Sequence, residues 1–188
     1  MDTDRRKFLW SASSATAMAL IGAKAALAAS EAAEIDRDAS AALQRLYGVD
    51  RRAASLRPKA AGILIFPKIV KAGFIFGAQG GKGALRIGDR SQAYYSIASA
   101  SFGLQAGVES FSYALFFMDQ SALRYLDQSD GWAIGTDPNV AILDHGAGAS
   151  LSSTTLAKQV IAFPFGEHGL MADLSLQGTK ITTYRPDP

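Results

Sequence analysis

The 188-residue sequence contains no cysteine and only two histidines. Without cysteine the chain can form no disulfide, no thiolate nucleophile and no cysteine-ligated metal site, and it lacks the acylated cysteine of a bacterial lipoprotein. His145 and His168 each adjoin one carboxylate and lie too far apart in the chain to form a paired zinc motif. We therefore expect no metal ion and no other cofactor.

Motifs for nucleotide binding and for serine catalysis are incomplete. The glycine-rich stretch 77–83 has Phe76 where a phosphate loop needs glycine, and Gly83 where it needs serine or threonine. Serine is abundant, but no G-x-S-x-G elbow presents a serine nucleophile to either histidine. We expect a protein that is not an enzyme, and a serine hydrolase that uses one of the two histidines is the least favoured alternative.

The N-terminus has the three successive regions of a twin-arginine export signal. Arg5 and Arg6 precede a weakly apolar run over 9–21, which is shorter than the about 20 residues that span the hydrocarbon core of a bilayer. A small-x-small pattern ends at Ala28, so signal peptidase is expected to cut between Ala28 and Ala29. The signal predicts export to the periplasm.

Cleavage would leave one domain over residues 29–188, a length that can bury a core without disulfides. The signal, residues 1–28, takes with it four of the 19 basic and two of the 17 acidic residues, which leaves 15 of each. A neutral domain lacks the strongly basic face that duplex nucleic acid requires. We expect a soluble periplasmic domain that binds no nucleic acid.

The chain changes character near residue 60. Before it, apolar residues recur at spacings of three and four, which is typical of amphipathic helix, and Gly48 and Pro58 are expected to break this helical stretch. After it, short β-branched and aromatic runs alternate with glycine, and Gly80-Gly81 and Gly88-Asp89 have the composition of hairpin turns. Strands are predicted at 63–66, 73–79, 82–87, 92–98, 102–108, 111–118, 140–143, 159–163, 170–176 and 180–184, and a short helix at 120–128 after Asp119.

These elements predict an α+β fold in which N-terminal helices pack on a strongly curved, mainly antiparallel sheet, either barrel-like or sandwich-like. Aromatic residues on the strands are expected to fill its core: Tyr94, Tyr95, Phe102, Phe111, Tyr113, Phe116 and Phe117. Aromatic residues next to predicted turns are candidates for an apolar surface or mouth that meets acyl chains or a partner: Phe66, Phe74, Phe76, Trp132 and Phe165.

Basic residues gather around the end of the helical stretch and the first strand: Arg51, Arg52, Arg57, Lys59, Lys68 and Lys71. Cations beside apolar residues suit anionic lipid headgroups, and each contributes about 1 kcal/mol near an anionic membrane. With Phe74 and Phe76 these residues form the predicted lipid-binding site, and ordinary solvated helix charge is the alternative.

Long segments of the chain resemble the SYLF domain family, in the same order as in that family. They are 62–74, 94–107, 112–118, Ser129-Asp-Gly-Trp132, 146–156 and 169–181, so the resemblance covers essentially all of residues 40 to 182. It implies a lipid-binding module without enzymatic activity. Family members in eukaryotes bind phosphoinositides, those of the yeast branch (Ysc-type) bind actin, and bacterial members are exported.

The resemblance attributes lipid binding to basic residues and an amphipathic N-terminal segment, which correspond here to the helical stretch before Pro58 and to Lys68 and Lys71. An exported bacterial protein meets no actin, so actin binding is not expected. The expected partners are anionic phospholipid or fatty acid, with peripheral membrane contact. A cell-envelope scaffold that binds a protein partner is the second hypothesis.

Overall fold

The computed structural model describes residues 29–73, 76–102, 107–129, 131–143, 151, 153–168 and 178–186. The predicted signal peptide, with Arg5, Arg6 and Ala28, lies outside them. The chain divides into two compact units, and the larger one spans Ile35–Tyr184. The description below concerns this larger unit.

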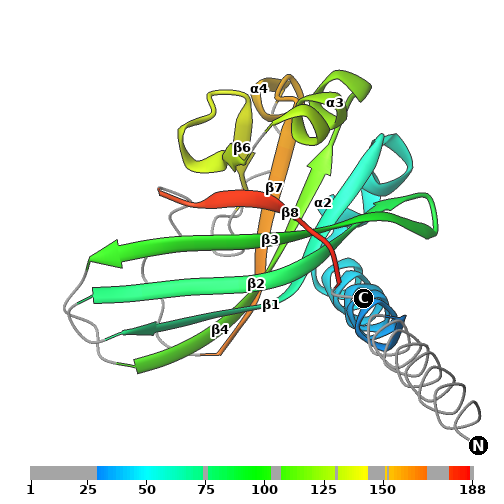
Figure 1. Ribbon diagram of the computed structural model, residues 1–188. Helices are drawn as coiled ribbons and strands as arrows, with labels where there is room; N and C mark the ends of the chain where they lie inside the picture. The colour runs from blue at the N-terminus through cyan, green and yellow to red at the C-terminus, as the bar shows by residue number, and fades with distance from the viewer. Residues whose placement is uncertain are drawn as a thin grey trace, which may run out of the picture. The chain divides into compact units, whose positions relative to one another are not determined.

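One eight-stranded sheet forms the framework of the unit (Figure 1). Its strands are β1 (Gly62–Gly73), β2 (Phe76–Ile87), β3 (Arg90–Phe102), β4 (Gly107–Phe117), β5 (Trp132–Ala133), β6 (Val140–Ile142), β7 (Val160–His168) and β8 (Lys180–Tyr184). Their order across the sheet is β5-β8-β3-β2-β1-β4-β7-β6. All neighbours are antiparallel except β6 and β7, which run parallel.

Helices cover both faces of the sheet at one end of the long strands. They are residues 35–49 of the first helix, which spans 29–49, then α2 (Arg51–Leu56) with the 3-10 turn η1 (Arg57–Lys59), α3 (Gln120–Gln128), the 3-10 turn η2 (Ile134–Thr136) and α4 (Ser153–Leu156). Within the described residues, no helix combines the length and apolar character needed to cross a membrane. The predicted α+β class with a strongly curved sheet is confirmed.

Each face of the sheet carries its own hydrophobic cluster because strand side chains alternate between faces. The α3 face buries Phe66, Tyr113 and Trp132, among others. The helix face, under the first helix and α2, buries Ile65 and Phe116. The first helix contributes a stripe of buried residues at helical spacing: Ile35, Ala39, Ala42, Leu43 and Leu46.

A β-bulge interrupts β1 between Ile65 and Lys68, where the register with both β2 and β4 shifts. Pro67 lies in this bulge, and its carbonyl oxygen accepts a hydrogen bond from Ser112 Oγ at 2.7 Å. A proline inside a central strand is tolerated there because the bulge already breaks the ladder of hydrogen bonds. The strand therefore continues past Pro67.

The prediction of a hairpin turn at Gly80-Gly81 was wrong, because both glycines lie within β2. A Cβ added at Gly81 would lie 2.5 Å from the carbonyl oxygen of Lys68, and one at Gly83 would collide with that of Ile65. Glycine is required here for close approach of two strands beside the bulge. The turn at Gly88-Asp89 is confirmed, with Gly88 at φ +62°.

Four long strands replace the six short ones predicted between residues 63 and 118. The last of those predictions, 111–118, corresponds to part of β4, which pairs with β1 and β7 and not with the preceding strand β3. The helix 120–128 is confirmed, and the carboxylate of Asp119 caps it by accepting a hydrogen bond from the Ala122 amide at 2.8 Å. The strand predicted at 170–176 lies outside the described residues.

The sequence predicted one set of aromatic residues in the core and another at the surface, and the structure agrees mainly with the first prediction. Five of the predicted core residues are buried: Tyr95, Phe111, Tyr113, Phe116 and Phe117. Tyr94 is half-buried, and the side chain of Phe102 lies outside the described part. Phe66, Trp132 and Phe165, which were expected near the surface, are buried as well, so that prediction was wrong.

Candidate functional site

The basic residues of α2 and η1 differ in whether the structure pairs them with a carboxylate. Arg51 and Lys59 are exposed. Arg52 forms a salt bridge with Asp50, with 2.6 Å between Nη2 and Oδ2, and Arg57 pairs with Asp89 at 3.2 Å. The predicted cluster therefore contains two guanidinium groups that already have carboxylate partners.

Asp50 joins the first helix to α2, and its side chain accepts the backbone N–H of Arg52 at 2.8 Å. Burial disfavours the charged carboxylate, but the hydrogen bonds and the positive charge of Arg52 outweigh burial and hold the pKa of Asp50 below its usual value. A lowered pKa means that ionised Asp50 stabilises the fold above pH 3.8, and that this contribution disappears as the pH falls through the lowered pKa.

Replacing Asp50 by asparagine should keep the helix cap and remove the ion pair. We expect Asp50→Asn to unfold at lower urea concentration than the wild type at pH 7, and the difference to shrink as the pH falls below the usual carboxyl pKa. Urea titrations between pH 7 and pH 2.5 would measure this. A difference that is constant across this range would contradict the assigned ion pair.

Lys68 and Lys71 lie on opposite faces of β1. Lys68 pairs across the sheet with Lys82, whereas Lys71 lies two residues after the buried Ile69 and shares its face. Phe74 lies outside the described residues, and the side chain of Phe76, the first residue of β2, is not described. The structure thus separates the predicted lipid-binding residues into the α2 group and the two faces of β1.

Beyond the helices, the outer half of strands β1 to β4 is open on the helix face. Three cross-strand rows lead outward from the edge of the first helix. They are Lys68, Lys82, Ser96 and Thr182; then Ser110, Val70, Gly80, Ala98 and Lys180; then Val108, Ala72, Ala78 and Ala100. We call these three rows the open face.

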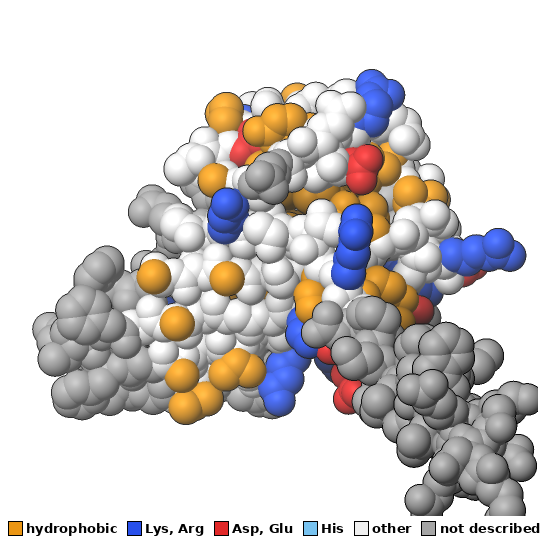
Figure 2. Space-filling view, viewed as in Figure 1, with side chains coloured by type: hydrophobic (Ala, Val, Ile, Leu, Met, Phe, Trp, Pro, Cys, Tyr) orange, Lys and Arg blue, Asp and Glu red, His pale blue; other side chains and the backbone are white. Residues whose placement is uncertain are grey.

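The outermost row of the open face is apolar and solvent-exposed. Ala72, Ala78 and Ala100 are exposed, and 74% of the Val108 side chain is accessible. Figure 2 shows apolar side chains spread over this part of the sheet, with Lys and Arg side chains beside them and no acidic side chain among them. Alanine and glycine make the surface shallow, because their side chains rise little above the strands.

Three lysines border the apolar part of the open face: Lys68, Lys82 and Lys180 are all exposed. Lys68 and Lys82 are directly opposed on neighbouring strands, an arrangement of like charges that is unfavourable by itself. Lys82 Nζ donates a hydrogen bond to Tyr184 Oη at 2.8 Å and lies 4.4 Å from the centre of that ring. An anion beside these amines would relieve their repulsion.

Sequence reasoning found Lys68 but missed Lys82, Lys180 and the small apolar residues. The available signal was the alternation of apolar or small residues at 70 and 72, at 78 and 80, and at 98 and 100, which indicates one common face on each strand. Which strands are neighbours depends on long-range pairing, and the alternation contains no information about it.

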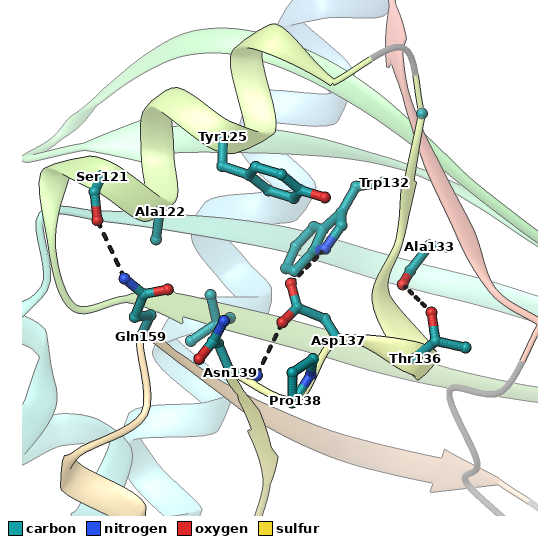
Figure 3. A pocket seen from close by; sticks show the side chains of 12 residues that line it. Ser121, Ala122, Tyr125, Trp132, Ala133, Thr136, Asp137, Pro138, Asn139 and Gln159 are labelled. Atoms are coloured by element: carbon teal, nitrogen blue, oxygen red, sulfur yellow. Dashed lines mark hydrogen bonds between the residues drawn. The ribbon is translucent and has the colours of Figure 1, made fainter.

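A separate pocket of about 660 Å³ lies between α3, β5, η2 and the start of β7. Figure 3 shows the rings of Tyr125 and Trp132 above it, and Pro138 and Asn139 below it. The carboxylate of Asp137 accepts hydrogen bonds from Trp132 Nε1 at 3.0 Å and from the backbone N–H of Asn139 at 2.8 Å. The carboxylate of Asp137 thus holds the loop together. Because this carboxylate is part of the lining, the pocket does not fit an anionic lipid headgroup.

A metal site would need a cluster of carboxylate and imidazole groups. Among the residues that the structure describes, no three His, Cys, Asp or Glu side chains come together in a way that could hold an ion. His145 lies outside these residues, and the side chain of His168, at the end of β7, is not described.

The chain matches the model of a known family, whereas comparison with curated proteins gave no match. The model of the Ysc84 family, described as Las17-binding protein actin regulator, matches residues 98–187. The match begins in β3 and includes β4, α3, β7 and β8. It confirms the resemblance to the SYLF family over residues 98–187.

Proposed function

We propose that this chain is a noncatalytic periplasmic protein that binds the surface of anionic phospholipid membranes through the open face. The observation that carries the proposal is the exposed apolar row bordered by Lys68, Lys82 and Lys180 without an acidic side chain among them. Periplasmic location rests on the export signal that the sequence predicts. The family whose model matches residues 98–187 supports a binding role.

The order of the rows matches the layers of a membrane surface. Val108 and the outer alanines could enter the boundary between headgroups and acyl chains, while the lysines one or two rows behind them remain at the level of the phosphates. Each lysine near an anionic surface contributes about 1 kcal/mol, so three of them give reversible binding that weakens as salt is added.

The shape of the open face favours a bilayer surface over a single enclosed fatty acid. Enclosure of an acyl chain requires a deep apolar cavity, whereas this face is an exposed sheet of alanine, glycine and valine. Fatty acid therefore becomes the less favoured of the two ligands that the sequence predicted.

Vesicle flotation with one matched pair of variants tests the proposal. Lys68→Gln and Lys71→Gln remove the same charge from the same strand, but on opposite faces. On vesicles of phosphatidylglycerol and phosphatidylcholine at low salt, we expect Lys68→Gln to weaken binding about fivefold and Lys71→Gln to have little effect.

Both variants should be compared in the full chain and in a chain that starts at Ala29, so that any contribution of the first 28 residues is common to each pair. Equal losses for the two variants would mean that total charge, and not the open face, controls binding. Failure of the wild type to float with anionic vesicles would reject membrane binding and leave the protein-binding scaffold as the better hypothesis.

A further inference from the structure

A second cavity, of about 490 Å³, lies on the far side of the first helix from the open face. Its walls come from the first helix, from η1 and the start of β1, and from the β2–β3 turn. The lining residues are Ser40, Leu43, Gln44, Tyr47, Arg57, Pro58, Ala60, Gly62, Ile63, Arg86, Gly88 and Asp89. Two of them are arginines from distant parts of the chain.

Arg86 is held at the back of this cavity by two of its three nitrogens. Nη1 donates to Ser40 Oγ at 3.1 Å, and Nη2 donates to the carbonyl oxygen of Asp89 at 2.8 Å. Its Nε is buried and has no hydrogen-bond partner within the described part of the chain. A buried guanidinium donor without an acceptor is costly, and a ligand oxygen would satisfy it.

Arg57 reaches the same cavity from η1. Its guanidinium carbon lies 5.5 Å from the centre of the Tyr47 ring. Burial raises the pKa of the Tyr47 hydroxyl, and the positive charges of Arg57 and Arg86 both act in the opposite direction. The charges of Arg57 and Arg86 therefore both act on the Tyr47 hydroxyl.

Asp89 is a carboxylate that already lies next to one of these two positive charges. Its Oδ1 lies 3.2 Å from Arg57 Nη2, but its side chain is 90% exposed, so water screens the pair and the contact is weak. Asp36, one turn before Ser40, is engaged elsewhere, because its oxygens accept hydrogen bonds from Ser91 and Tyr94. Among the carboxylates that the structure describes, Asp89 is thus the one with which an incoming anion would compete for Arg57.

We propose that this cavity binds a phosphate group, clamped between Arg57 and Arg86, and that Asp89 is the internal competitor which the phosphate displaces. Phosphate fits better than a carboxylate because residues that can donate hydrogen bonds line the cavity from three elements, namely Gln44 and Tyr47, Arg57 and Arg86, and a phosphate offers at least three acceptor oxygens. The group could belong to a free phosphate or to a phospholipid headgroup. This site is independent of the open face.

Calorimetric titration of the full chain with inorganic phosphate and with glycerol 3-phosphate, at constant ionic strength and with chloride as the reference anion, tests the site without any membrane. We expect Arg57→Gln to weaken binding about tenfold, because it removes one charge-assisted contact. Asp89→Asn should strengthen binding several-fold, because it releases Arg57 and removes a like charge. Arg51→Gln, an exposed arginine outside the cavity, is the matched control and should bind as the wild type does.

The opposite signs for Arg57→Gln and Asp89→Asn protect the test against loss of folding, since a misfolded variant cannot bind more tightly. A second arm uses vesicles with and without phosphatidic acid. Binding of the soluble phosphates with this pattern of variants identifies a free phosphate site, whereas the same pattern on phosphatidic acid vesicles alone identifies a headgroup site. Equal affinities of all three variants, or no saturable binding in either arm, would overturn the proposal.

Discussion

Reversing the charge of Lys68 and Lys180 together should lower affinity for anionic vesicles by about a thousandfold. The double variant Lys68→Glu/Lys180→Glu changes four units of charge on the open face, and each unit near an anionic surface is worth about 1 kcal/mol. Both side chains are exposed, so the fold should tolerate the change. Vesicle sedimentation over a range of lipid concentrations measures the affinity.

The control for this prediction is Arg51→Glu/Lys59→Glu, which makes the same change of net charge on α2 and η1. These two residues belong to the site that the sequence predicts, so the comparison also decides between the two surfaces. A large loss in the α2 variant and a small loss in the open-face variant would reject the open face and favour the helical region. The open-face proposal predicts the reverse order.

Replacing Trp132 by alanine should lower the free energy of unfolding by about 3 to 5 kcal/mol. The indole is only 3% exposed, lies 5.8 Å from the ring of Phe117 between centroids, and donates its hydrogen bond to Asp137. The loss is a large part of the about 5 to 15 kcal/mol that stabilises an ordinary domain. Urea unfolding followed by circular dichroism measures it, since the variant loses the indole as a fluorescent reporter.

Val108→Ala is the matched control for the core variant. Because 74% of this side chain is already in water, its truncation should change stability by less than about 0.5 kcal/mol. It should nevertheless weaken vesicle binding, because it removes apolar surface from the open face. A loss of several kcal/mol in Val108→Ala would show that the outer row is packed against another part of the chain.

The elements with strong local signals were predicted from the sequence. The helix 120–128 was recognisable because Asp119 is a good cap and Leu123 and Leu126 have helical spacing. The turn at Gly88-Asp89 follows from glycine at positive φ. In each case, a few neighbouring residues determine the local backbone.

Long-range features were not predictable in the same way. Gly80-Gly81 has the composition of a turn, yet the need of β2 to approach β1 closely decides its conformation. Phe66 and Trp132 flank a bulge and a loop, and tertiary packing buries both. The open face could not be predicted for the same reason, since Lys68 and Lys180 are 112 positions apart and lie on one face only through strand pairing.

The bulge at Pro67 determines which side of β1 faces outward. Phe66 and Ile69 are three residues apart and yet lie in the same cluster, because the bulge accommodates one extra residue between them. If the strand kept Pro67 but continued without the bulge, the rest of the strand would be inverted. Lys68 and Val70 would then turn toward the α3 side and Ile69 toward water, so the bulge sets the orientation of the binding surface that begins after it.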